Sequence, residues 1–305
     1  MAGSTRPGRL GIGVIGAGKV GAVLGAALRG VGHAVVGVSA VSEDSRERAE
    51  NLLPGVPVLQ IPEIVERAEL VLLAVPDDAL PELVEGLAAA GVWQPGQLVV
   101  HTSGRFGTGV LAPARAKGAI PLAIHPAMTF TGMSLDLARL TDCSFGVTAE
   151  ATVLPIAQAL VVEMGGEPVV IAEQDRTLYH AALAHASNHL VTIAAQSAQL
   201  LAEAGVEQPD RVLSALMRAS LENALASGES ALTGPVARGD AGTVRSHHEA
   251  LLRREVDSGS TDIRLAYEEL ARATAQRALE RGLLKETQAT EILDILAQSH
   301  PEENP

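Results

Sequence analysis

A glycine-rich turn near the start of the chain constrains its fold more than any other feature. An apolar, β-branched run at residues 10–15 leads directly into GAGKVG at residues 16–21, and an alanine-rich helical pattern follows. We expect Gly16 to permit a tight turn, Gly18 to let the backbone approach a pyrophosphate, and Gly21 to let helix and strand pack closely. Strand, turn and helix in this order predict a dinucleotide site at a helix N-terminus.

The first half of the chain alternates short β-branched runs with helical patterns, which is typical of a parallel sheet covered by helices. We predict strands at residues 10–15, 34–39, 70–75, 98–101, 120–124, 145–148 and 168–171. Helical patterns lie at residues 20–29, 45–53, 62–68, 79–90, 109–116 and 154–164. The expected fold is α/β, with an N-terminal doubly wound Rossmann sheet.

Strand signals stop after residue 173. The remaining third predicts only helices, at residues 176–204, 209–226, 241–254, 261–281 and 285–298. We therefore expect two domains, a nucleotide-binding Rossmann domain at residues 1–173 and an all-helical substrate and dimerisation domain at residues 174–305. The two ends, residues 1–7 and 300–305, have the composition of disordered segments.

Composition excludes several classes of ligand. The chain has 36 acidic and 23 basic residues and a formal charge of −13, so attraction to nucleic acid or anionic lipid cannot drive binding. The only cysteine, Cys143, excludes an internal disulfide and a multi-cysteine metal site. Glycines interrupt the apolar run 10–27, which otherwise imitates a signal peptide. We expect a cytoplasmic protein without nucleic-acid, membrane or metal partners.

The end of the second predicted strand bears on the choice between NAD and NADP. An acidic side chain there would hold the ribose 2′-hydroxyl of NAD, whereas this chain has Ser39. Ser42 follows, and Arg46 and Arg48 lie on the next helix, so hydroxyl and guanidinium groups are available for a 2′-phosphate. NADP is favoured, and NAD is the alternative. The expected cofactor contacts, including the loop after the strand at 70–75, are Gly16, Gly18, Lys19, Val20, Gly21, Ser39, Ser42, Arg46, Val75 and Pro76.

Two strand-end loops and one long helix carry polar residues suited to catalysis. The loops are HTSG at 101–104 and HPAMTF at 125–130, and both should open toward the same crevice as the glycine turn. On the helix from Arg176, His185 shares a face with Asn188 and with His189.

Hydride transfer to a carbonyl or imine needs a proton donor, and the unperturbed pKa of histidine suits that role near neutrality. His185 is the first candidate, with Asn188 orienting the substrate, and His125 and Ser103 are alternatives. Arg238 is either a bidentate clamp for a substrate carboxylate or a surface arginine.

Three stretches of the sequence resemble a known family: YHAALAHASN at 179–188, ALTGPVARGD at 231–240, and the His125-Pro126 loop. Together they resemble Rossmann-like bacterial proteins with a C-terminal domain of unknown function (DUF). More distantly, the chain is similar to the superfamily of 6-phosphogluconate, 3-hydroxyisobutyrate and ketopantoate dehydrogenases and pyrroline-5-carboxylate reductase. The resemblance implies a 6-phosphogluconate-dehydrogenase-like helical domain whose first long helix lines the active site. Hydroxyisobutyrate-type members use a Lys and an Asn at the spacing of His185 and Asn188, so His replaces the Lys here.

These observations favour an NADP-dependent oxidoreductase that reduces a small carbonyl or imine acid, with a ketopantoate-like compound as a candidate. Because the Lys is absent, a non-catalytic NADP-binding sensor or partner protein is the alternative. A third hypothesis is a metal-dependent hydrolase that uses His101, His125, His185 and His189.

The long helix also bears on assembly. Small residues lie on more than one of its sides, which a helix packed on a single neighbour would not need: Ala181, Ala182, Ala184, Ala186, Ala194, Ala195 and Ala198. Neighbouring helices of the same domain are one possible partner. The similar dehydrogenases bury their helical domains against a second subunit, which favours a homodimer formed through residues after Asp175.

Overall fold

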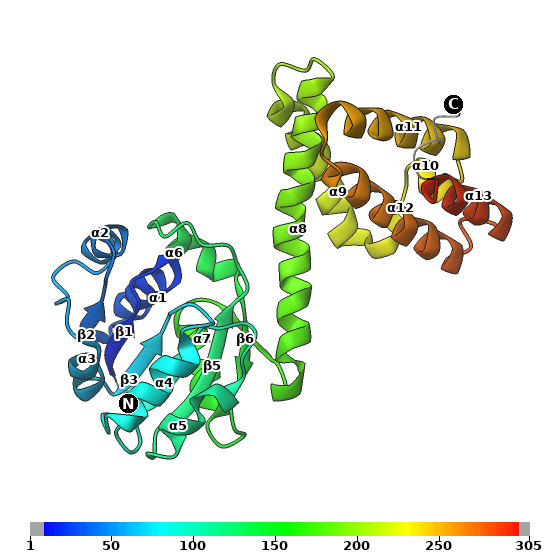
Figure 1. The fold of residues 1–305 in the computed structure, drawn as a ribbon. Coiled ribbons are helices and arrows are strands. Elements are labelled where there is room, and N and C mark those ends of the chain that lie inside the picture. Colours follow the sequence, from blue (N-terminus) through cyan, green and yellow to red (C-terminus); the bar gives the residue numbers. More distant parts are fainter. Residues whose placement is uncertain (1–8, 299–305) are drawn as a thin grey trace, which may run out of the picture. The chain divides into compact units, whose positions relative to one another are not determined.

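The computed structural model describes residues 9–298 of the protein. Its N-terminal part contains a seven-stranded sheet with the strand order β2-β1-β3-β4-β5-β6-β7 (Figure 1). The ends predicted to be disordered, 1–7 and 300–305, lie outside the described residues. The strands are β1 (Gly11–Ile15), β2 (Ala34–Ser39), β3 (Leu70–Leu73), β4 (Leu98–His101), β5 (Ile120–Pro126), β6 (Ser144–Thr148) and β7 (Glu167–Val170). All seven lie at the predicted positions. β3 ends two residues earlier than expected and β5 two residues later.

The sheet is parallel except at one pair. The predicted parallel arrangement is confirmed for the other strand pairs, whereas β6 runs antiparallel to β5, with His125 opposite Gly146. The physical reason is that residues 127–143 leave and rejoin the sheet at the same edge, where the Ala127 amide donates to the Ser144 carbonyl. A connection that does not cross the sheet brings the chain back in the opposite direction.

Helices cover both faces of the sheet. They are α1 (Lys19–Gly30), α2 (Glu43–Leu52), α3 (Ile61–Arg67), α4 (Leu80–Ala89), α5 (Ala112–Arg115), α6 (Leu135–Arg139) and α7 (Leu154–Glu163), with 3-10 turns η1 (Thr108–Leu111), η2 (Leu140–Asp142) and η3 (Glu173–Asp175). The short α6 was not predicted, because five residues carry too little periodicity to be recognised.

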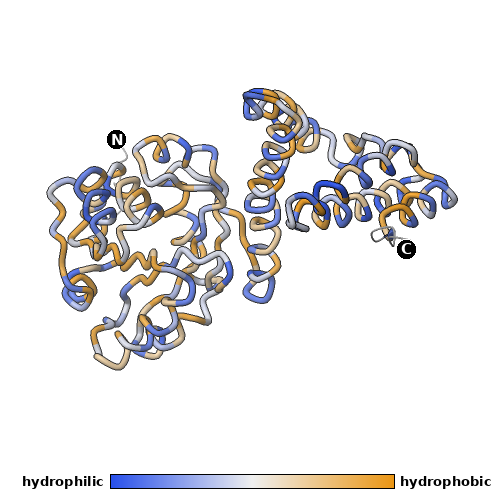
Figure 2. The backbone as a smooth tube through the Cα atoms, turned by 45° about the horizontal axis from the view of Figure 1, so that its top comes forward, coloured by the Kyte–Doolittle hydropathy of each residue, from blue (hydrophilic) through white to orange (hydrophobic). Residues whose placement is uncertain are grey.

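The rest of the chain is helical, as predicted. Its elements are α8 (Arg176–Glu203), α9 (Pro209–Ser227), η4 (Gly228–Ala231), α10 (Pro235–Arg238), α11 (Ala241–Ser258), α12 (Asp262–Glu280) and α13 (Glu286–Leu296). Figure 2 shows hydrophobic and hydrophilic residues interleaved along α8. None of the helices in the described part of the chain is long and apolar enough to cross a membrane.

The chain divides within α8 into two compact units, Met1–Leu190 and Val191–Pro305. The domain boundary expected at residue 173 stays a prediction. In the second unit, Val244, Ala275 and Ile292 lie in the core formed by α10 to α13. A buried His248–Glu268 pair at 2.9 Å joins α11 to α12 there.

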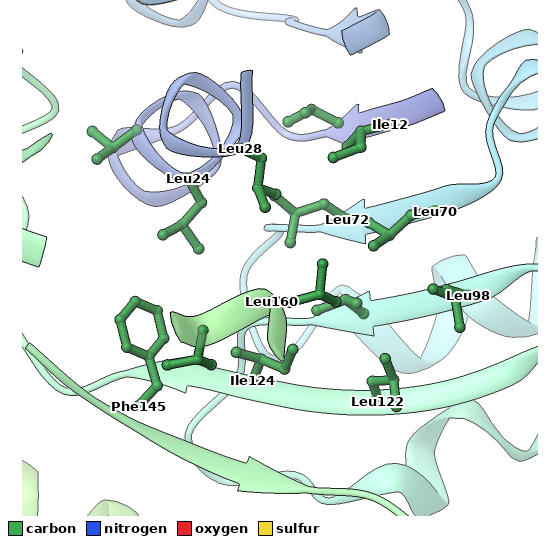
Figure 3. Close-up of a cluster of buried hydrophobic side chains, with 14 of the residues drawn as sticks. Ile12, Leu24, Leu28, Leu70, Leu72, Leu98, Leu122, Ile124, Phe145 and Leu160 are labelled. Carbon is green, nitrogen blue, oxygen red and sulfur yellow. The ribbon is translucent and has the colours of Figure 1, made fainter. Parts of the chain in front are cut away.

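Alternate residues of each central strand face opposite sides of the sheet, as the two-residue period of a strand requires. Ile12 and Leu72 belong to the cluster under α1 and α7, which Figure 3 shows. Val71, Leu73 and Val99 belong to the cluster under α3 and α4. The central strands are therefore buried on both faces, whereas the edge strand β7 is largely exposed.

Candidate functional site

The glycine turn lies where β1 and β3 are neighbours, although the chain visits β2 between them. This reversal of strand order is the place where open α/β sheets bind ligands. Gly16 has φ 98°, and a Cβ there would lie 2.5 Å from the Ala74 carbonyl oxygen. A Cβ on Gly21 would lie 2.0 Å from the Gly16 oxygen, whereas one on Gly18 would have nothing within 4 Å. The turn thus packs tightly on one side and leaves open space beside Gly18 at the start of α1.

The two serines expected near the cofactor ribose make local hydrogen bonds. The Ser39 side chain is buried, and its Oγ accepts from the Gly16 amide at 2.9 Å. Ser42 caps α2 by accepting from the Ser45 amide. Both hydroxyls therefore shape the turn and the helix start. Each retains one proton that it can donate.

An arginine and a lysine lie beside the turn. Arg48 reaches back from α2, and its Nη1 donates to the Ala17 carbonyl at 3.2 Å. A Cβ on Gly132 would lie 2.9 Å from the Arg48 Cδ and 3.0 Å from the Lys19 Cγ, so the segment around Gly132 rests on both side chains. Arg46, one of the expected contacts, is exposed on α2. Arg46 and Arg48 flank opposite sides of the buried face of α2, and the sequence could not indicate which one faces the turn.

A buried aspartate fixes the segment around Gly132. The Asp136 carboxylate accepts from the amides of Thr131 and Gly132 at 2.7 and 2.8 Å, and Arg139 lies 3.4 Å away. Although burial opposes the charge, these hydrogen bonds and Arg139 hold the pKa of Asp136 below its usual range. The segment is therefore pinned against the glycine turn by an ionised carboxylate.

A cavity of about 330 Å³ lies between the loop after β5 and the first half of α8. Its lining residues are His125, Ala127, Met128, Thr129, His180, Leu183, Ala184, Ala186, Ser187 and Asn188. On α8 most of them follow the spacing i, i+3, i+4, i+7 and i+8 from His180, which defines one helix face. The cavity brings together His125 and Asn188 from the predicted site and adds His180 and Ser187, which the prediction did not include.

His125 is held from one side by Tyr179, whose hydroxyl oxygen lies 3.0 Å from Nδ1. The rings of Tyr179 and His180 contact the imidazole edge to face. Burial, assisted by the positive charge of Arg176, lowers the pKa of His125 to about 4. His125 is therefore neutral near pH 7, in contrast to the expectation of an unperturbed histidine.

The loop after β4 packs against this cluster. His101 is fully buried, its Nε2 lies 2.8 Å from the Gly107 carbonyl, and its Nδ1 accepts from the Ser103 amide. The Ser103 hydroxyl is buried and accepts from the Phe106 amide. A Cβ on Gly104 would lie 2.6 Å from the His180 ring and 3.0 Å from the His125 Nε2. Ser103 thus shapes the loop, while Gly104 allows it to approach the histidines.

His185 does not line the cavity. Its ring is exposed and pairs with His189, with 2.8 Å between their Nδ1 atoms. Five positions along a helix from His180 correspond to a rotation of about 140°, which turns His185 away from the lined face. Arg238, in the second unit, is exposed and lies 3.4 Å from the Thr233 hydroxyl.

The described residues contain no group of three His, Cys, Asp or Glu side chains that could hold a metal ion. The four histidines of the hydrolase hypothesis are therefore not assembled as metal ligands within residues 9–298.

Comparisons with known proteins agree with this architecture. Residues 1–126 match the Rossmann-like domain, and residues 143–274 match a domain of unknown function, DUF2520. No curated protein matches the sequence.

Several solved structures share the fold, among them the following three. A candidate NADP oxidoreductase from Bacteroides fragilis is 24% identical with TM-score 0.70, covering 88% of this chain and 98% of its own. An imine reductase from Pseudomonas sp. is 15% identical with TM-score 0.56, covering 94% and 92%. A Plasmodium falciparum pyrroline carboxylate reductase with NADP bound is 10% identical with TM-score 0.52, covering 95% and 100%.

The predicted resemblance and fold class are confirmed by the two family matches and by the observed sheet and helices. This chain therefore carries a Rossmann-like domain followed by the domain of unknown function DUF2520.

Proposed function

We propose that this protein is an NADP(H)-dependent oxidoreductase that reduces a small carbonyl or imine compound. One observation carries the proposal: a single segment after β5 touches both halves of the candidate site. Met128 and Thr129 line the cavity. Gly132, four residues after Met128, rests against the side chains of Lys19 and Arg48 beside the glycine turn. A dinucleotide at the turn and a small molecule in the cavity would therefore be neighbours. The similar structures that bear the names NADP oxidoreductase and imine reductase support the same reaction class.

The turn supplies the features that a dinucleotide needs. Gly18 leaves open space at the N-terminus of α1, where unpaired amides and the helix dipole favour a pyrophosphate. We assign the cofactor to Gly16, Gly18, Lys19, Val20, Gly21, Ser39, Ser42, Arg46, Val75 and Pro76. To these we add Arg48, because its guanidinium already lies at the turn. This cation, with the Ser42 hydroxyl nearby on the chain, favours NADP over NAD.

In the cavity, we assign the proton-donating position to His125, with Asn188 orienting the substrate. His125 takes precedence over His185 because it lines the cavity and His185 does not. Ser103 acts indirectly, by shaping the loop that packs on His125. The expected role of Arg238 in holding a substrate carboxylate stays a prediction, because Arg238 belongs to the second unit and does not line the cavity. The bound nicotinamide would supply the hydride.

Calorimetric titration and a turnover screen test this function together. NADPH should bind at least tenfold more tightly than NADH, a difference of about 1.4 kcal/mol. Gly18→Val should abolish NADPH binding while the fold survives, since the added side chain meets only open space in the free protein.

A screen of 2-oxo acids and cyclic imines should reveal NADPH oxidation, and His125→Asn should remove this activity. Tight NADPH binding without turnover would instead favour the sensor hypothesis, and equal affinity for both cofactors would contradict the assignment of NADP.

We further propose a homodimer formed mainly through residues after Asp175. Within the described chain, α8 buries only Arg176 and α9 buries no residue. Large apolar side chains lie exposed on both helices: Leu178, Leu190, Val191, Val212, Leu216, Leu221 and Leu225. Such surfaces are typical of subunit interfaces.

We also propose a cytoplasmic location. The single cysteine, Cys143, is a free thiol, which is compatible with a reducing compartment.

A further inference from the structure

Arg176, the first residue of α8, is a fully buried cation, and no carboxylate within residues 9–298 forms an ion pair with it. Its Nε donates to the Phe106 carbonyl at 2.9 Å and its Nη1 to the Gly146 carbonyl at 3.2 Å, while its Nη2 is buried and makes no hydrogen bond. The nearby Glu173 carboxylate is already occupied by the amides of Thr108 and Gly109. Burying an arginine charge without a paired anion costs free energy. A functional role for the charge would explain why it is kept here.

The Arg176 guanidinium carbon lies 5.8 Å from the centre of the Tyr179 ring. Burial raises the pKa of the Tyr179 hydroxyl, and the positive charge of Arg176 opposes that rise. Residue 146 must be a glycine for Tyr179 to approach it, because a Cβ there would lie 2.6 Å from the hydroxyl. The Tyr179 hydroxyl lies 3.0 Å from His125 Nδ1 and donates its hydrogen there when Nδ1 is unprotonated. In that arrangement the single proton of the neutral His125 lies on Nε2.

We propose that Tyr179 is a positioning residue and proton source behind His125, and that Arg176 is the built-in counter-charge for the tyrosinate that forms. The proposal rests on the proposed reduction. When the substrate carbon accepts a hydride, the electron pair of its double bond moves to the oxygen or nitrogen, which takes the proton from His125 Nε2. Nδ1 takes the proton of the Tyr179 hydroxyl in the same step. The tyrosinate remains beside Arg176 until the product leaves. Nδ1 then returns its proton to the tyrosinate while water protonates Nε2, which restores both groups.

This relay solves a problem that His125 alone would have. Besides Tyr179, the charged or titratable groups around His125 are Arg176, His180 and His101, and each of these three disfavours its protonated form. An imidazolium donor would be scarce near neutral pH, and a neutral imidazole that gave up its only proton would become an anion. A second proton delivered to Nδ1 avoids both difficulties.

Tyr179→Phe removes the hydroxyl and keeps the ring. In this variant, turnover should fall on the order of 100-fold, while KM changes less than about twofold. In the wild type, the turnover rate should stay constant through neutral pH. The control is Tyr267→Phe, because Tyr267 makes the same kind of hydrogen bond, to His247 at 3.1 Å, in the second unit. Unchanged turnover and pH profile in Tyr179→Phe would overturn the relay.

Nitrogen-15 NMR of the histidine rings in the free protein provides a test that needs no substrate. His125 should carry its proton on Nε2 in the wild type and become a mixture of both tautomers in Tyr179→Phe. A wild-type proton on Nδ1 would refute the relay even if the reductase function holds. In Arg176→Gln the His125 pKa should rise, and in Arg176→Lys it should stay low. If Arg176→Gln does not fold, the lysine variant and the tautomer measurement still decide.

Discussion

Gly21→Ala should destabilise the protein, although alanine normally favours a helix over glycine. The structure sets the size of the effect. Helix propensity alone would gain about 1 kcal/mol. The added Cβ would lie 2.0 Å from the Gly16 oxygen and 2.8 Å from the Ala74 Cβ, and neither atom belongs to a flexible side chain that can rotate away. Overpacking of this kind costs about 1–3 kcal/mol, and the backbone obstacle places it at the upper end, so a net loss of about 2 kcal/mol is expected.

Gly86→Ala is the matched control, because Gly86 is also a helical glycine but a Cβ there would meet nothing within 4 Å. This variant should gain about 0.5–1 kcal/mol. Urea unfolding followed by fluorescence can measure both, since Trp93 is the only tryptophan and is buried in the first unit. A Gly21→Ala protein as stable as wild type, or equal changes in both variants, would show that contact at the turn does not decide the effect.

Three further outcomes are expected. The free energy of unfolding should fall by about 3 kcal/mol for each of His101 and His125 as the pH drops from about 6.5 to 4. In that range the unfolded histidines take up protons while the folded ones, with pKa values of about 4, do not. His125→Asn should make the free energy of unfolding in urea less pH-dependent, and an unchanged pH dependence would argue against the lowered pKa. Arg48→Ala should weaken NADPH binding about tenfold in calorimetry, whereas a larger loss in Arg46→Ala would reverse our assignment. Light scattering should report a dimer at micromolar concentration, and a 31.5 kDa monomer would exclude the proposed assembly.

The glycine turn and the strands around it could be predicted from sequence because their requirements are local. Gly16 needs a positive φ and Gly21 needs the absence of a side chain, and both requirements reappear in the structure. Apolar β-branched runs marked every strand within two residues. The direction of β6 was not predictable from its residues, since a strand buried on both faces has the same pattern whichever way it runs.

The composition of the cavity was decided by tertiary structure. Polar and small residues lie all around α8, so its sequence has no single stripe to indicate which face meets the loop after β5. Docking of Tyr179 against Gly146 fixes the rotation of the helix, brings His180 and Asn188 to the cavity, and turns His185 away from it. The sequence by itself determined the glycine turn before α1, because a tight turn before a helix is a local backbone property. Only the tertiary structure decided which histidine faces the cavity, and it made that histidine neutral by burying it beside Arg176.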